Sequence, residues 1–347
     1  MAAVSPRVTL AVLAVLGVLC GTAIFGTAKA APYETPCCFG TAKAAPYETP
    51  SAFGTAKASY ENTRSAPSET AYVGRGFSRA APVDDTPRCI ISLVPATTEM
   101  LFLMGAGTRI VGVSNYDRFP PEVERIAKVG GLLDPDVETM LSLKPDLVVV
   151  YDTQTDLKRQ LERAQVPMFA YVHRGLPDIT ATIRALGARI GEQAAADAAA
   201  VRIEQQLAAI GRRVAGRPRP STLLVFGREP GTMRRVLASG GYGFLHDVLE
   251  LAGGADVLTD LHKQSVEMSA EMILTRKPEV ILELHYGSSL APAAMEAERK
   301  VWSALPSLPA VRNNRVYLLA GDEFVVPGPR IVVAAERFAR TLHPEAF

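Results

Sequence analysis

The stretch Glu138-Thr-Met-Leu-Ser-Leu-Lys-Pro145 decides the fold, because it recurs later in the chain as Glu271-Met-Ile-Leu-Thr-Arg-Lys-Pro278. In both copies, apolar residues at i, i+3 and i+4 form the buried stripe of a short helix, and the glutamate lies outside it. Lys-Pro then ends the helix, because the residue before proline avoids the helical region, and the aliphatic run that follows predicts a strand buried on both faces. The repeat therefore predicts two α/β lobes of one design, each with a solvated carboxylate on a helix. The stripe residues are Val137, Met140 and Leu141, and then Ala270, Ile273 and Leu274.

Length, composition and charge exclude several classes of function. The 347 residues, 48% of them hydrophobic, suffice for two cores of ordinary size. A formal net charge of +1, from 37 basic and 36 acidic residues, gives no electrostatic footprint for nucleic acid. The chain has no Cys or His cluster with metal-ligand spacing and no Gly-x-Ser-x-Gly motif. We therefore expect neither an enzyme nor a metal site, cofactor or nucleic-acid partner.

Residues 1–30 have the three parts of a cleaved signal peptide, which predicts export. Arg7 precedes an apolar stretch over 8–25, and Ala28-Lys-Ala30 provides a small-x-small cleavage site. Two alternatives stay open. Cys20 could carry a lipid anchor, although a leucine precedes it where a lipobox has a small residue, and the apolar stretch approaches the ~20 residues of an uncleaved membrane anchor.

A fourteen-residue repeat follows, beginning at Phe25, Phe39 and, in degraded form, Phe53. It is rich in alanine, proline, threonine and glycine and contains few large apolar groups, so residues 31–86 are predicted to be a disordered tether. The vicinal pair Cys37 and Cys38 leaves open a role in cross-linking or adhesion.

From residue 87 onward, strands alternate with helices, which predicts parallel sheets with helices on both faces. We expect an N-terminal lobe over 87–190, a bridging helix over 191–216 with its regular part at about 194–214, and a C-terminal lobe over 217–347. The predicted fold class is α/β, with two Rossmann-like lobes with parallel sheets joined by one long rigid helix and a ligand cleft between the lobes.

Several motifs together resemble the periplasmic binding proteins of ABC importers for vitamin B12, ferric siderophores and haem. The resemblance covers residues 88–343 and is closest to the cobalamin-binding members. It implies a monomer at the periplasmic or extracytoplasmic face that captures cobalamin, or alternatively a ferric complex or haem, and delivers it to a permease dimer with its ATPase subunits. The motifs are Ile-Ser-Leu-Val-Pro-Ala-Thr-Thr-Glu99, Val-Gly-Val-Ser-Asn-Tyr116, Lys-Val-Gly-Gly131, the two Glu-to-Lys-Pro units, Leu-Ala-Gly-Gly254 and Pro-Gly-Pro-Arg330.

The resemblance also implies that Glu138 and Glu271 dock onto arginine pockets of the permease. The sequence pattern agrees, because both glutamates lie off the buried stripe. Such ion pairs contribute specificity and association rate more than affinity.

Ligands of open parallel sheets bind beyond the carboxyl ends of the strands. A corrin is broad, flat and rimmed by amides, so aromatic faces and scattered polar groups suit it. Tyr116 matches the stacking aromatic of the cobalamin binders, whereas Leu132 stands where those proteins often have tryptophan. The predicted ligand-binding residues are Tyr116, Phe119, His173, Arg228, Tyr242, His285, Asp322 and Phe324.

Other interpretations remain for some of these residues. His173 or His285 could ligate cobalt or haem iron, and Arg228 could bind an anionic siderophore. Alternatives for the whole chain are an exported metal- or tetrapyrrole-processing enzyme, and a surface protein that adheres through its repeats.

Overall fold

The structure, a computed structural model, describes residues 86–287 and 291–347. The predicted signal peptide, the lipidation candidate Cys20, the Cys37–Cys38 pair and all but the last residue of the predicted tether lie outside the described residues. Within the described ranges, no helix has both the length and the apolar character needed to cross a bilayer.

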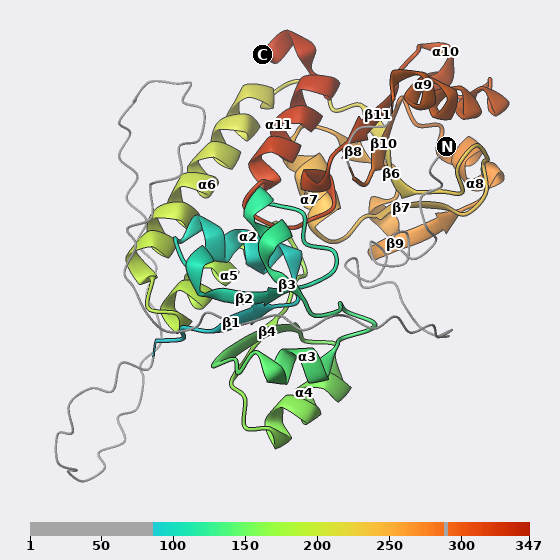
Figure 1. Cartoon of the computed structure of the whole chain (residues 1–347). Coiled ribbons are helices and arrows are strands. Elements are labelled where there is room, and N and C mark those ends of the chain that lie inside the picture. The colour runs from blue at the N-terminus through green and yellow to red at the C-terminus, as the bar shows by residue number, and fades with distance from the viewer. Residues whose placement is uncertain (1–85, 288–290) are drawn as a thin grey trace, which may run out of the picture.

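The N-terminal lobe is built on a five-stranded sheet with the order β3-β2-β1-β4-β5, in which all strand pairs are parallel. Helices α2 and α5 lie on one face and α3 and α4 on the other (Figure 1). Interior strand β4 is buried at every position, because helices cover both faces. The elements are β1 (Ile90–Ser92), α2 (Pro95–Leu103), β2 (Ile110–Val113), β3 (Ala127–Lys128), α3 (Val137–Ser142), β4 (Leu147–Tyr151), α4 (Thr155–Arg163), β5 (Met168–Tyr171) and α5 (Leu176–Arg189).

The C-terminal lobe differs from the prediction, because its sheet is mixed. The strand order is β11-β10-β6-β7-β9, with β8 also paired to β6, and β7 is antiparallel to both β6 and β9. Only residues 228–235 separate β6 from β7, too few for the crossover that parallel neighbours need. The elements are β6 (Ser221–Gly227), β7 (Val236–Gly240), α7 (Phe244–Leu251), β8 (Ala255–Asp256), β9 (Lys263–Met268), α8 (Ala270–Arg276), β10 (Val280–His285), α9 (Pro292–Val301), α10 (Pro309–Arg312), β11 (Val316–Ala320) and α11 (Ile331–Leu342).

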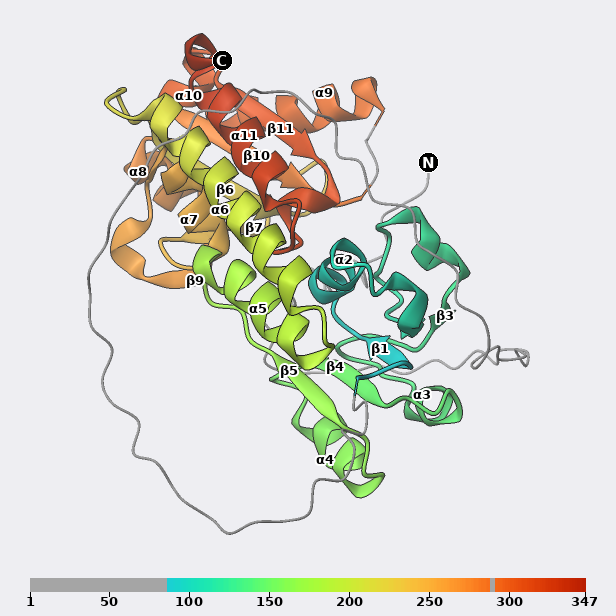
Figure 2. The ribbon, with the colours of Figure 1, turned by 90° about the vertical axis from the view of Figure 1, so that its left-hand side faces the viewer.

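One long helix, α6 (Gln193–Val214), runs between the two sheets, and it begins within a residue of the expected position. It packs against α5 of the N-terminal lobe and against α7 and α11 of the C-terminal lobe (Figures 1 and 2). Its buried residues, among them Ala196, Ala200, Ile203 and Leu207, recur at i, i+3 and i+4 and form one apolar stripe along it.

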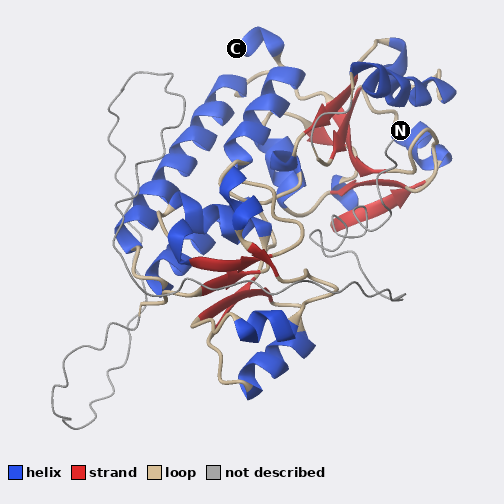
Figure 3. Ribbon diagram, in the orientation of Figure 1, coloured by secondary structure: helices blue, strands red, loops and turns tan. Residues whose placement is uncertain are grey.

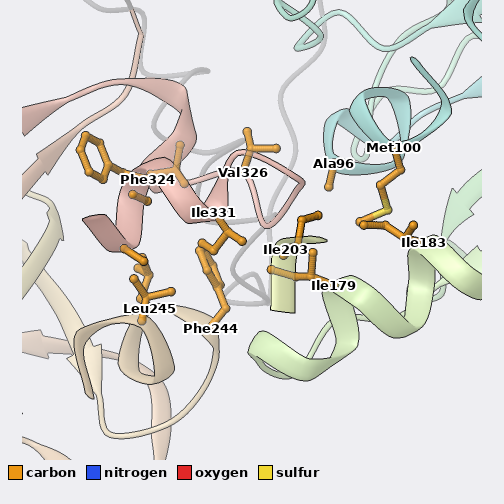
Figure 4. Close-up of a cluster of buried hydrophobic side chains, with 14 of the residues drawn as sticks. Ala96, Met100, Ile179, Ile183, Ile203, Phe244, Leu245, Phe324, Val326 and Ile331 are labelled. Atoms are coloured by element: carbon orange, nitrogen blue, oxygen red, sulfur yellow. The ribbon is translucent and has the colours of Figure 1, made fainter. Parts of the chain in front are cut away.

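The hydrophobic core does not divide into one core for each lobe. Its largest cluster runs from strand β1 through α5 and α6 to α7 and α11, so it crosses from one lobe into the other. Figure 4 shows Met100 and Ile183 of the N-terminal lobe, Ile203 of α6, and Phe244 and Ile331 of the C-terminal lobe in this cluster. Two smaller clusters fill the outer faces of the two sheets. The lobes therefore form one packed body on the side of α6, where Figure 3 shows helices between the two sheets.

Candidate ligand and docking sites

The repeated sequence units fold into matching structures in the two lobes. Helices α3 and α8 each begin at a side-chain cap: Asp136 Oδ1 accepts the N–H of Thr139 at 2.9 Å, and Ser269 Oγ accepts the N–H of Met272 at 3.2 Å. The predicted docking residues Glu138 and Glu271 occupy the second position of each helix and are exposed.

Each of these helices is followed by a lysine in the left-handed conformation, Lys144 and Lys277, both at φ 49°. Lys-Pro therefore ends the helix as expected, but the lysine is left-handed instead of extended. The expected stripe holds for the buried Met140 and Ile273 and is wrong for Leu141, which is 38% exposed. Helix α3 has less than two turns, and one buried residue anchors it.

Tyr116 and Phe119 lie in the loop after β2, at the carboxyl end of the first sheet. The Tyr116 ring rests against Gly131, where a Cβ atom would come within 2.6 Å of the ring, so only glycine leaves room for it. Phe119 lies beneath the guanidinium of Arg330, which is 4.3 Å from the ring centroid. Both aromatic side chains are partly exposed, as a ligand contact requires.

Arg330 links the two lobes. Its Nη2 and Nε donate to the two carboxylate oxygens of Glu99 at 2.6 and 3.0 Å, and its Nη1 lies 3.6 Å from Glu323. Glu99 is almost fully buried in α2. Burial raises the pKa of Glu99 to about 7, and the hydrogen bonds and charge of Arg330 offset only part of that increase.

Asp117 is a second buried acid at the same end of the sheet. Its carboxylate accepts the N–H of Ser114 at 2.9 Å and also the hydroxyl of Ser114. Burial raises the pKa of Asp117 to about 6 against these hydrogen bonds and the charge of Lys128.

His173 follows β5 at the boundary between the lobes. Its ring stacks on Tyr171 at 6.1 Å and meets the edge of Phe244 of the C-terminal lobe at 5.0 Å. Neither ring nitrogen has a hydrogen-bond partner within the described protein, and the same holds for the Tyr171 hydroxyl. Burial lowers the pKa of His173 to about 4, so its ring is neutral at physiological pH.

Arg228 lies inside the C-terminal lobe, where its side chain is only 2% exposed. Its guanidinium is 2.8 Å from Glu283 of β10 and 2.8 Å from Glu298 of α9. Glu283 also accepts the Nε1–H of Trp302 at 2.7 Å and lies 3.1 Å from Nε2 of His285. Burial opposes ionisation of Glu283, but hydrogen bonding to His285, the charge of Arg228 and the Trp302 bond prevail and lower its pKa. In this conformation the guanidinium of Arg228 is therefore already paired with two carboxylates of its own lobe, and its role as a ligand contact stays a prediction.

The remaining predicted residues lie in different environments. Tyr242 follows β7 and is 44% exposed, and Asp322 accepts the N–H of Gly287 at 2.9 Å. Phe324 is fully buried and stacks on Phe338 at 5.6 Å, so its ring lies in the core in this structure, and its place in the ligand site stays a prediction. Its loop position did not show that its side chain points into the core.

The structure thus brings Tyr116 and Phe119 together at the boundary with three residues that the prediction did not assign to the site: Glu99, Arg118 and Arg330. Glu99 and Arg330 each end a motif quoted in the sequence analysis, but nothing in the sequence indicates that the two residues pair with each other. Among the described residues, no group of three or more His, Cys, Asp or Glu side chains is placed to hold a metal ion.

Comparison with known proteins gives the class. The sequence profile described as "Periplasmic binding protein" matches residues 90–323, and the chain belongs to this family of non-enzymatic, transporter-associated binding proteins.

Relatives and solved structures carry different ligand names. A vitamin B12-binding protein of Salmonella typhimurium is 29% identical over 255 residues, covering 73% of this chain and 89% of the relative. An uncharacterized ABC transporter substrate-binding lipoprotein of Bacillus subtilis is 26% identical over 266 residues, covering 75% and 82%. The structure of a periplasmic heme-binding protein from Roseiflexus shares the fold with a TM-score of 0.64, at 21% identity over 75% of this chain and 99% of that one.

Proposed function

We propose that this protein is the extracytoplasmic substrate-binding component of an ABC importer and that its ligand is cobalamin. The ligand site would lie between the lobes, beside Tyr116 and Phe119. Glu138 and Glu271 would dock the two lobes onto the permease.

The pairing of two arginines near the proposed site, Arg330 and Arg228, favours an uncharged ligand, while Arg118 faces the ring of Tyr286. Arg330 faces Glu99 and Glu323, and Arg228 is enclosed by Glu283 and Glu298. An anionic ferric siderophore would have to compete with these carboxylates for the cations, at a cost in desolvation. A corrin presents amides to its surroundings, and partly exposed aromatic rings with scattered polar groups suit it better.

Haem is the second candidate, because of His173. Iron is ligated by neutral imidazole, and the lowered pKa keeps this ring neutral with both nitrogens unpartnered within the described protein. Its enclosure between Tyr171 and Phe244 means that the lobes would have to part for iron to reach it.

Calorimetric titration of the protein with cyanocobalamin, haemin and a ferric siderophore tests the proposal. If cobalamin is the ligand, Tyr116→Ala should weaken its binding by about 1 to 2 kcal/mol, the size of an aromatic contact with its buried area. His173→Phe should leave cobalamin binding unchanged and abolish the spectral shift of any bound haem. Tight binding of haemin or an iron complex, with no heat from any corrinoid, would reject the cobalamin assignment. Arg228→Ala is a poor probe of ligand charge, because it leaves two carboxylates without their cation.

A further inference from the structure

A second link between the lobes lies beside Tyr116 and involves Arg118 and Tyr286. Tyr286 follows β10 in the C-terminal lobe, and its hydroxyl lies 3.5 Å from the main-chain oxygen of Tyr116 in the N-terminal lobe. The guanidinium of Arg118 lies over the Tyr286 ring, 5.8 Å from its centroid. The Tyr286 side chain therefore spans the boundary at the residue proposed to stack on the ligand.

This link is much weaker than the one made by Arg330. The Arg330–Glu99 pair makes two hydrogen bonds, of 3.0 and 2.6 Å, and is largely buried. The Tyr286 hydroxyl is uncharged, its bond to Tyr116 is at the limit of hydrogen-bond length, and Arg118 is near the ~6 Å limit of a cation–π contact. Arg118 itself is exposed. Of the two links, the one with Tyr286 can therefore open at small cost.

A flat ligand that stacks on Tyr116 and also contacts the C-terminal lobe needs the space that the Tyr286 side chain crosses. Resting on the proposed function, we propose that Arg118 and Tyr286 form a latch across the ligand site of the free protein, and that the latch opens to admit the ligand. The Glu99–Arg330 pair stays closed and keeps the lobes in register. The latch lowers the fraction of binding-competent protein, and so reduces apparent affinity by the same factor.

Stopped-flow mixing of the full chain with cyanocobalamin tests the latch. Tyr286→Ala and Arg118→Ala should each raise the association rate about twofold to fivefold, the factor that corresponds to a partly exposed cation–π contact. The double variant should be no faster than the singles, because both remove one latch. Tyr286→Phe, which keeps the ring and loses the hydroxyl, should give a smaller increase. Arg184→Ala is the matched control, because Arg184 pairs with Glu204 away from the boundary and its loss should change nothing.

Two kinetic outcomes would overturn the proposal. Unchanged association in both alanine variants would show that no latch limits access. Faster dissociation with weaker affinity in Tyr286→Ala would make Tyr286 a ligand contact instead.

Hydrogen–deuterium exchange of the ligand-free protein separates this proposal from the proposed function. If the latch exists, amides of residues 115–119 exchange about twofold to fivefold faster in Tyr286→Ala than in wild type, and Arg184→Ala matches wild type. Faster exchange without corrinoid binding would keep the latch and reject cobalamin. Equal exchange in all three proteins would reject the latch whatever the ligand.

Discussion

The buried carboxylates of the two lobes have opposite ionisation properties. In the N-terminal lobe, burial raises the pKa of Glu99 to about 7 and that of Asp117 to about 6, whereas Glu283 in the C-terminal lobe has a lowered pKa. Glu283 has Arg228, His285 and Trp302 around it, all from its own lobe. Glu99 depends on Arg330, which belongs to the other lobe. Burial alone therefore does not fix the charge of an acid, because the hydrogen bonds and cations around it can outweigh the burial, as they do for Glu283.

The exposed carboxylates, in contrast, are alike in the two lobes. Glu138 and Glu271 follow equivalent caps and precede equivalent left-handed lysines. The lobes have thus kept the same outer helix on sheets of different topology, which is what docking onto two related permease surfaces would require.

The largest expected effect comes from removing both exposed glutamates. Glu138→Ala with Glu271→Ala should abolish ligand transport in reconstituted importer, because neither lobe could pair with the permease. Each single variant should give a partial defect, since one lobe stays docked. Glu162→Ala, which removes an exposed glutamate of α4, is the control and should transport normally. Loss of ligand affinity in the double variant would place these carboxylates at the ligand site and contradict the docking role.

Glu99 is expected to change the free energy of unfolding by about 3 kcal/mol between low and neutral pH, the size of its pKa shift. Glu99 has a raised pKa in the folded protein, so it contributes stability below pH 4.5 that is lost as pH rises toward 7. Glu99→Gln mimics the protonated acid, so it should match wild type near pH 5 and exceed its stability near pH 8. Glu283 has a lowered pKa, and its contribution is lost only on acidification, so Glu283→Gln should be less stable than wild type throughout this range.

Urea unfolding of the three proteins at pH 5, 6, 7 and 8 measures this contrast. The difference between wild type and Glu99→Gln is the quantity to follow, because neutral His173 contributes a trend of the opposite sign below pH 6.5. If Glu99→Gln is less stable than wild type at pH 8, then Arg330 keeps the Glu99 carboxylate ionised. The buried glutamates of the two lobes would then not differ in the direction of their pKa shifts.

The smallest effect concerns the two caps. Asp136→Ala and Ser269→Ala should each lower the free energy of unfolding by about 1 kcal/mol. Asp136 should cost slightly more, because its carboxylate also accepts the Thr139 hydroxyl at 2.7 Å. Thermal unfolding provides the measurement, with the exposed Ser307→Ala as control. A cap effect in one lobe alone would show that the two units are stabilised differently.

Elements with a strong period or a repeat could be predicted from the sequence. The bridging helix α6 begins within one residue of its expected start, and both repeated helices end at Lys-Pro. The strands β7 and β9 were not foreseen, because glycine and serine in β7 resemble a loop and β9 alternates only weakly. Helix α9 has no buried residue and so no apolar stripe to detect.

The candidate site was harder to predict than the fold. The loop position of Tyr116 could be predicted because the residue belongs to a motif and follows a strand, whereas its contact with a ligand stays a prediction. The pairing of Arg228 with Glu283, or of Arg330 with Glu99, joins residues far apart in the chain, and a single sequence carries no signal for such pairs. The burial of Phe324 could not be foreseen, because loop residues near a sheet edge can point either way.

The hydrophobic cluster that crosses from β1 to α11 also decides how the molecule denatures. Because Met100, Ile203 and Phe244 belong to one continuous apolar cluster, neither lobe can lose its packing while the other keeps its own intact. Separating the lobes at their boundary would expose the part of that cluster that lies between them to water, at a cost of roughly 25 cal/mol for each Å² uncovered. We therefore expect the two lobes to unfold as a single cooperative unit. A chimaera that takes each lobe from a different relative would have to keep the side chains of this shared cluster complementary in order to fold.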